Sequence, residues 1–110
     1  ERVIKRAVKI DDRPLTIDDI LDRVCTHFHV TQSNVFTKSR KHELVIARQV
    51  SMYLAQKHTK MPASRIGKLV GGRDHSTVVH SCNLIEKRLK IDKEFQNEIS
   101  SIENSFKLKN

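Results

Sequence analysis

The stretch from Met61 to Cys82 constrains the fold of this chain more than any other part of the sequence. A helix-forming run ends there at the pair Gly71-Gly72, and a second helical run follows with Asp74 near its start. Two short helices joined by a glycine turn are the scaffold of a helix-turn-helix. The second run is polar at its beginning and then apolar at helical spacing, at Val78, Cys82, Ile85 and Leu89. The sequence therefore predicts a helix whose shaft packs in a core while its tip stays free to contact a partner.

The rest of the chain is predicted to be helical as well. Its 110 residues include three glycines and two prolines, and 37% of them are apolar, without tryptophan. This is enough for one mostly aliphatic core and too little for two. Apolar periodicity and capping residues predict helices at 16–28, 32–36, 42–58, from 62 onwards, 74–90 and 92–106. The expected class is all-α, with the helix at 42–58 in the centre because it is apolar on two sides, and with Val35 and Phe36 both filling the core.

The first 13 residues pair apolar and basic side chains at helical spacing and predict a short helix outside the compact domain of residues 14–110. One interpretation is a linker helix docked on its neighbours. Another is a helix that lies on an acidic membrane surface through residues 2–9. No apolar run approaches the roughly 18 residues of a membrane span, and no signal-peptide pattern opens the chain. Because the chain begins at Glu1, we expect it to be a fragment of a longer protein.

Two cysteines and six histidines raise the question of disulfide and metal chemistry. Cys25 and Cys82 lie far apart within helical patterns, which favours two buried thiols in a reducing compartment, while a disulfide between them stays open. His27 and His29 stand close together, but no tight Cys/His cluster with the spacing of metal ligands occurs. We therefore predict no metal site.

The positive charge of the chain is confined to one third of its length. Residues 37–73 hold nine basic side chains and one acidic side chain, Glu43, whereas the segments on either side are balanced. The excess of nine minus one equals the formal net charge of +8 of the whole chain. A run of charge usually marks only a solvated face. Here the excess leads into the helix-turn-helix, which is typical of a surface that binds a polyanion.

The tip of the second helix suits contact with a nucleic acid. A helix start exposes N–H groups without an internal partner and carries partial positive charge, so phosphates bind there. In a major groove the hydroxyls of Ser76 and Thr77 reach base edges, Asp74 accepts from cytosine N4, and His75 can hydrogen-bond. Each residue also has a purely structural interpretation. Asp74 is a good N-cap, the two hydroxyls are common in a first helical turn, and His75 suits a plain surface position.

Two runs of the sequence resemble a known family. The run Thr37-Lys38-Ser39-Arg40 is similar to the basic loop of the C-terminal DNA-binding domain of DnaA, the bacterial replication initiator. A closer match follows at Ile66-Gly67 and at Gly71-Gly72-Arg73-Asp74-His75-Ser76-Thr77-Val78-Val79-His80. The resemblance covers roughly residues 14–110 and is far more specific than a bare helix-turn-helix pattern. It implies a Trp-repressor-like fold that binds DnaA boxes in double-stranded DNA at a bacterial origin, in the cytoplasm. It also implies that residues 1–13 lead in from an ATPase module that binds ATP or ADP.

The resemblance also implies a set of DNA contacts. Base contacts fall at Arg40 in the minor groove and, in the major groove, at Asp74, His75, Ser76 and Thr77. Phosphate contacts fall at Lys38, Lys41, Arg48, Gln49, Thr59, Lys60, Ser64 and Arg73. The chain departs from the family pattern at Ser76, where threonine is usual, and at Ser64, where proline is frequent. The methyl group absent at Ser76 puts a thymine-methyl contact there in doubt.

Other functions have weaker support. The sequence lacks a phosphate-binding GxxxxGK[ST] loop, a nucleophile elbow and a pair of carboxylates with an obvious pocket, so we expect neither catalysis nor a cofactor in this chain. A transcription regulator would use the same helix-turn-helix, usually as a dimer on a palindrome. No zipper or second core face is visible, so we expect a monomer. The third alternative is a module that binds membranes or proteins through residues 2–9.

Overall fold

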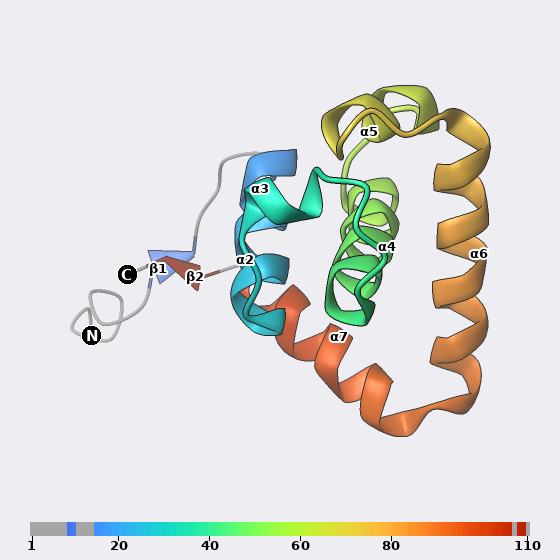
Figure 1. The fold of residues 1–110 in the computed structure, drawn as a ribbon. Helices are drawn as coiled ribbons and strands as arrows, with labels where there is room; N and C mark the ends of the chain where they lie inside the picture. The colour runs from blue at the N-terminus through green and yellow to red at the C-terminus, as the bar shows by residue number, and fades with distance from the viewer. Residues whose placement is uncertain (1–8, 11–14, 107, 110) are drawn as a thin grey trace, which may run out of the picture.

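The computed structural model describes residues 9–10, 15–106 and 108–109. Within these ranges the chain forms six helices and one pair of two-residue strands (Figure 1). In chain order they are β1 (Lys9–Ile10), α2 (Ile17–Phe28), α3 (Gln32–Val35), α4 (His42–His58), α5 (Ala63–Leu69), α6 (His75–Ile91), α7 (Lys93–Ser105) and β2 (Leu108–Lys109). The prediction of an all-α domain is confirmed, because helices make up almost all of the regular structure.

The predicted helix at residues 1–13 falls mostly outside the described residues. At Lys9–Ile10, which are described, the structure differs from the prediction. These two residues form a strand that pairs antiparallel with Leu108–Lys109, so the two ends of the described chain lie side by side (Figure 1). The physical reason is tertiary, since the backbone partners of a strand come from a distant segment that a local amphipathic pattern does not report.

Side-chain caps determine where four of the helices begin. At α2 the Thr16 hydroxyl accepts from the backbone N–H of Asp19 at 3.2 Å, and the Asp19 carboxylate accepts from Thr16 N at 3.1 Å, which is a capping box. Thr31, Asp74 and Asp92 accept in the same way from the N–H three residues on, at the starts of α3, α6 and α7. Each bond satisfies a donor that has no partner inside its helix. The predicted N-cap at Asp74 is thus confirmed.

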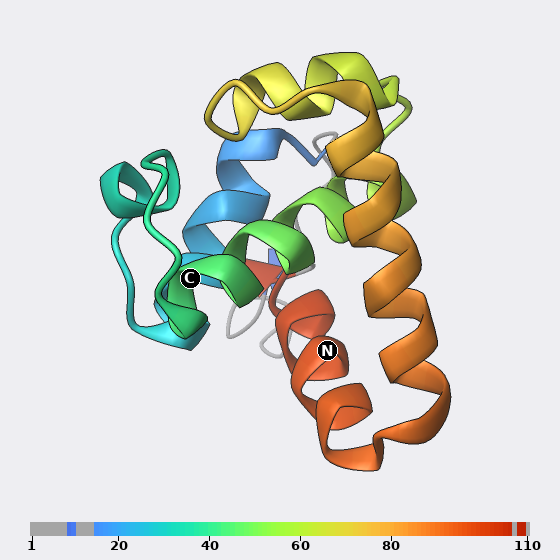
Figure 2. The same ribbon diagram turned by 45° about the vertical axis from the view of Figure 1, so that its right-hand side comes forward.

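Helix α4 lies at the centre of the molecule, with α2 and α3 on one side and α6 on the other (Figure 1). Its two predicted apolar stripes are both buried: Leu44, Ile46, Ala47, Val50, Ser51, Tyr53, Leu54 and Ala55. Helix α5 covers one end of this arrangement and α7 the other, in both views (Figures 1 and 2). The central position follows from the sequence, since a helix that is apolar on two sides must have partners on both.

The short helix α3 contributes less to the core than predicted. Val35 is fully buried, but the ring of Phe36 is 40% exposed. The helix ends at Val35, and the Thr37 N–H bonds back to Asn34 O at 3.1 Å, so the chain turns away at Phe36. The expectation that Phe36 fills the core is therefore wrong, because the turn points the ring outward.

The predicted helix-turn-helix is present as α5, a turn at 70–74, and α6. Ile66 and Val70 are fully buried on the first side of the turn, and Val78 is fully buried on the second. Gly71 and Gly72 have φ of +82° and +73°, the left-handed region that glycine enters without a Cβ clash. The turn then folds back on α5, where Arg73 N donates to the Gly67 carbonyl at 2.7 Å.

Both cysteines are buried free thiols, as predicted, and they form no disulfide. Burial, and after it the charge of Glu86, raises the pKa of Cys82 to about 11, so the thiol stays protonated at neutral pH. Burial also raises the pKa of Cys25. In the described part of the chain, none of the helices combines the length and apolar character that crossing a membrane requires.

Candidate nucleic-acid interface

The first turn of α6 is exposed, as a helix tip that enters a groove must be. Asp74, His75, Ser76 and Thr77 are all accessible to solvent, while Val78 directly after them is fully buried. The sequence left two roles open for Asp74, and the structure shows one of them. Its Oδ1 accepts from Thr77 N at 2.9 Å and caps the helix. Hydrogen bonds from the backbone and side chain of Thr77 hold the pKa of this exposed carboxyl below its ordinary value. The cap uses one oxygen, and the carboxylate has a second.

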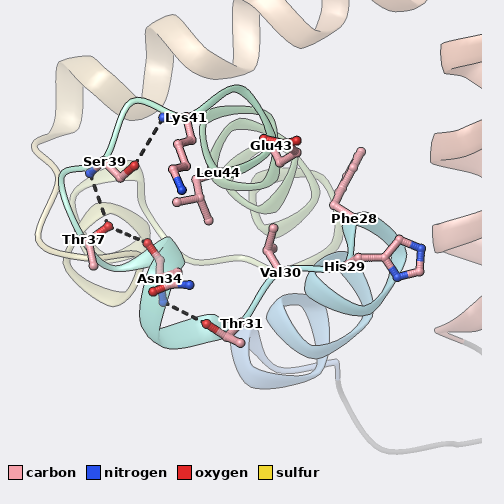
Figure 3. A pocket seen from close by; sticks show the side chains of 10 residues that line it. All are labelled: Phe28, His29, Val30, Thr31, Asn34, Thr37, Ser39, Lys41, Glu43 and Leu44. Atoms are coloured by element: carbon pink, nitrogen blue, oxygen red, sulfur yellow. Dashed lines mark hydrogen bonds between the residues drawn. The ribbon is translucent and has the colours of Figure 1, made fainter.

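The basic loop, residues 37–41, is held in shape by bonds among its own polar groups (Figure 3). The Thr37 hydroxyl donates to Asn34 O at 2.7 Å and accepts from Ser39 N at 3.2 Å. The Ser39 hydroxyl in turn accepts from Lys41 N at 3.3 Å. These bonds occupy the hydroxyls and leave the cationic side chains in solvent. Those exposed side chains are Lys38, Arg40 and Lys41.

A pocket of about 620 Å³ lies beside the basic loop, between the end of α2 and the start of α4 (Figure 3). Phe28, Val30 and Leu44 form its apolar part. None of the five predicted base-contact residues lines it. The residues predicted to read DNA therefore belong to the outer surface of the domain and not to this pocket.

The side chain of Arg48 is buried and bonded inside the protein. Its side chain is 7% exposed, and its Nε donates to the Val35 carbonyl at 2.8 Å. Its Nη1 donates to the Ser39 carbonyl and its Nη2 to the Thr37 carbonyl at 2.8 Å. The guanidinium thus points inward under the basic loop, and the phosphate contact of Arg48 stays a prediction. Burial, and then the neighbouring charge of Arg73, lowers the pKa of Arg48.

Arg73 connects the turn of the helix-turn-helix to the basic loop. Its Nη1 donates to the Gly71 carbonyl and its Nη2 to the Thr37 carbonyl, both at 2.8 Å. The turn and the loop lie next to each other in both views, and the segment 71–74 runs from there across to the start of α6 (Figures 1 and 2). Thus two predicted elements of the interface, far apart in the sequence, are joined through one carbonyl oxygen.

Among the remaining residues predicted to contact phosphates, some side chains are accessible to solvent and one is hydrogen-bonded within the protein. Lys60 and Ser64 are exposed, and Gln49 is half-buried. The Thr59 hydroxyl donates to Ala55 O at 2.6 Å and accepts from Met61 N at 3.3 Å, so it completes the end of α4. The Thr59 hydroxyl proton is therefore donated inside the protein, and the phosphate contact of Thr59 stays a prediction.

The nine cations of residues 37–73 are not equivalent in the structure. Arg48 is buried, Arg73 is half-buried, and Lys57 pairs with Glu103 of α7 at 2.7 Å. The six others are exposed, and among the described residues none has a carboxylate within ion-pair distance: Lys38, Arg40, Lys41, Lys60, Arg65 and Lys68. The positive field outside the protein therefore comes from the basic loop, the end of α4 and α5.

A family model described as the bacterial dnaA protein helix-turn-helix matches residues 17–85, from the start of α2 into α6. The chain belongs to this family.

Curated relatives agree with the family assignment. The chain is 43% identical over 110 residues to the chromosomal replication initiator protein DnaA of Bacteroides fragilis, which covers 100% of this chain and 23% of that protein. It is 44% identical over 109 residues to the protein of the same name from Bacteroides thetaiotaomicron, with 99% and 23% covered. It is 43% identical over 105 residues to the chromosomal replication initiator protein DnaA of Streptococcus thermophilus, which covers 93% of this chain and 23% of that protein. The chain thus spans less than a quarter of the length of these relatives.

Sequence reasoning missed the bonds of Arg48 and Arg73 to the basic loop. A signal for Arg48 was available, since it stands between Ala47 and Val50 in the part of α4 that is apolar on two sides. A charged residue at a buried position needs hydrogen-bond partners, which predicts internal bonds and not a phosphate. No comparable signal exists for Arg73, because its partner Thr37 is 36 residues away.

Proposed function

We propose that this domain binds DnaA boxes in double-stranded DNA and so anchors a replication initiator at a bacterial origin. The observation that supports it best is the pairing of an exposed polar helix tip with an exposed basic loop, joined by Arg73. The relatives are named as chromosomal replication initiators, which agrees with this role. The net charge of +8, placed in residues 37–73, provides sequence-independent attraction to the phosphate backbone.

In the proposed complex the tip of α6 enters the major groove. Ser76 and Thr77 donate to or accept from base edges, and the Thr77 methyl contacts a thymine methyl. His75 adds a hydrogen bond or an apolar contact, and the second oxygen of Asp74 accepts from cytosine N4. These side chains are short, so the tip must approach closely. The partial positive charge of the helix start adds an attraction to the phosphates beside the groove.

Arg40 is proposed to enter the neighbouring minor groove, where a narrow A·T-rich stretch attracts an arginine. Lys38, Lys41 and Lys60 are exposed and are proposed to contact phosphates, as are Ser64 and the half-buried Gln49. Arg73 retains N–H groups beyond the two bonds it makes and lies beside the tip, so a phosphate contact is proposed for it as well. Arg48 is left out of this set because its guanidinium is buried under the basic loop, and the Thr59 hydroxyl is left out because its proton is donated inside the protein.

Binding of the domain to a labelled DnaA-box duplex and to a scrambled duplex tests the proposal. We expect a clear preference for the box, and we expect Thr77→Ala and Arg40→Ala to reduce that preference by roughly 5- to 100-fold. Lys60→Ala is the matched control, because loss of a phosphate contact weakens both duplexes about equally. If Thr77→Ala binds every sequence as the unchanged domain does, the assignment of base reading to the tip is wrong.

The stoichiometry on one box distinguishes the proposed role from that of a dimeric regulator. One domain per box is expected for the initiator role, whereas two on a palindrome indicate the regulator. Contact with acidic phospholipid through residues 2–9 stays a prediction, because residues 1–8 lie outside the described ranges. The cytoplasmic location and the ATP or ADP of an upstream module likewise stay predictions.

A further inference from the structure

One backbone oxygen in the basic loop accepts from two arginines that come from different elements. The Thr37 carbonyl receives Nη2 of Arg48, from α4, and Nη2 of Arg73, from the turn before α6, each at 2.8 Å. We call these residues the arginine pair. Arg48 also holds the carbonyls of Val35 and Ser39, so it bonds to every second residue from Val35 to Ser39. The next residue, Arg40, is the exposed side chain proposed to enter the minor groove.

These bonds determine how freely the basic loop can move. A loop lacks the regular backbone bonds of a helix or sheet, so its carbonyls need other donors or water. The planar guanidinium provides several donors in a rigid fork, and hydrogen bonds to charged groups are stronger than neutral ones. Arg48 thus fixes the loop on α4, and Arg73 fixes the same residue of the loop on the turn. A loop held before binding loses less conformational entropy when DNA binds.

The charges of the arginine pair favour the same interpretation. Two guanidiniums share one oxygen and repel each other, and among the described residues no carboxylate lies within ion-pair distance of either. An approaching phosphate backbone places negative charge beside them and reduces this repulsion. The bonds that orient the loop are therefore expected to strengthen when DNA is present.

We propose that Arg48 and Arg73 are positioning residues for sequence recognition, which hold the basic loop and the helix-turn-helix as one unit so that Arg40 and the tip of α6 contact adjacent grooves in register. The inference rests on the proposed function. It assigns Arg48 to the basic loop instead of to a phosphate, and it gives Arg73 a role beyond that of a local cation.

A double-mutant cycle with Arg40→Ala tests the proposal. Binding to box and scrambled duplexes is measured for Arg48→Lys and Arg73→Lys, each with and without Arg40→Ala. Lysine keeps the charge but cannot bond several carbonyls with a fixed fork. We expect each lysine variant to lower the box-to-scrambled ratio by roughly 5- to 50-fold when Arg40 is present, and by less than about 2-fold when it is absent. Arg88→Lys on α6, which pairs with Asp92 away from the basic loop, is the matched control and should leave the ratio unchanged.

Two outcomes overturn the positioning role. One is that the lysine variants lower the box-to-scrambled ratio equally with and without Arg40, which indicates that the two arginines act independently of Arg40. The other outcome concerns Arg73→Ala. If the slope of log K against log salt becomes shallower by about 0.9 while the box-to-scrambled ratio is unchanged, Arg73 makes only a phosphate contact. Circular dichroism shows whether Arg48→Lys folds. If it does not, Arg73→Lys alone tests the proposal, because the side chain of Arg73 is only half-buried. If the unchanged domain shows no preference for the box, the proposed function itself is wrong. This outcome is distinct from a failure of the positioning role, in which the unchanged domain still prefers the box.

Discussion

Three glycines in the helix-turn-helix face different steric constraints. At Gly67 an added Cβ would lie 2.1 Å from the Arg73 carbonyl oxygen, where the turn crosses α5. At Gly71 it would lie 3.0 Å from the Phe36 oxygen, and φ is +82°. At Gly72 there is open space, and only the φ of +73° is unfavourable for other residues. The close approach at Gly67 is therefore the tightest constraint on this motif.

We predict that alanine destabilises the domain in the order Gly67, Gly71, Gly72. Gly72→Ala should cost about 1 kcal/mol, the usual penalty for a left-handed residue with a Cβ. Gly71→Ala should cost more, because the Phe36 backbone must also move. Gly67→Ala should cost the most, since α5 and the turn must separate. Urea denaturation of the three variants measures the order, and a Gly67→Ala domain as stable as the unchanged one contradicts it.

The N-cap of α6 gives a prediction for Asp74. Its pKa lies below the ordinary value of 3.8 because hydrogen bonds from Thr77 favour the carboxylate. A lowered folded-state pKa contributes stability above about pH 3.8, and that contribution is lost as the pH falls through the folded value. Asp74→Ala should lower the melting temperature at pH 7, whereas Asp74→Asn, which keeps a capping oxygen, should lower it less. Equal losses in the two variants would show that the cap bond contributes nothing.

At the scale of elements, α7 is attached to α2 and α4 by polar as well as apolar contacts. His27 of α2 contacts Glu98 at 3.1 Å, and Lys57 and His58 of α4 both contact Glu103 at 2.7 Å. Burial disfavours the charged form of Glu103, but the bonds from Lys57 and His58 outweigh it, so the pKa of Glu103 lies below the ordinary 4.5.

We predict that Glu103→Gln lowers stability at pH 7 by up to about 1 kcal/mol, the usual range for a partly exposed ion pair. The lowered pKa means that the contribution exists above pH 4.5 and disappears as the pH falls through the folded value. Urea denaturation at pH 7 and at pH 3 should therefore show a difference only at pH 7. Exposed Glu94 on the same helix provides the control Glu94→Gln. A difference of the same size at both pH values contradicts the ion-pair explanation.

At the scale of the whole molecule, charge and core occupy different places. The apolar core is built around α4, while the six exposed cations come from the basic loop, the end of α4 and α5. Such a separation places the cations on the surface, where their attraction to DNA depends strongly on salt.

We predict that log K for DNA falls against log salt with a slope of roughly −4 to −7, as expected for the neutralisation of five to eight phosphates. Lys60→Ala should make the slope shallower by about 0.9 and leave the box-to-scrambled ratio unchanged. Fluorescence anisotropy from 50 to 200 mM salt, roughly the range over which such slopes are measured, tests both. A slope near −1 would show that this surface does not bind the phosphate backbone as proposed.

Local patterns in the sequence determined the order of the helices and the exposure of the tip. Caps such as Thr16 and Asp74 bond to groups three residues away, and a helical stripe repeats every three or four residues, so both can be read along the chain. The polar first turn of α6, followed by the buried Val78, was predictable for the same reason. The basic loop was recognisable as the start of the charged third of the chain.

Only the tertiary structure decided how these parts are joined. Arg48 bonds to residues 9 to 13 positions away, and Arg73 bonds to Thr37 across 36 positions. Whether such an arginine faces a phosphate or a carbonyl depends on what lies opposite it in space, and charge alone is the same in both cases. The outward ring of Phe36 and the strand at Lys9–Ile10 depend likewise on a turn and on a distant partner. The sequence by itself therefore determines hydrogen bonds between near neighbours and the apolar stripes of helices, because both depend on residues a few positions apart. The partners of long side chains and of single strands depend on which distant segments pack against them, so only the tertiary structure decides them.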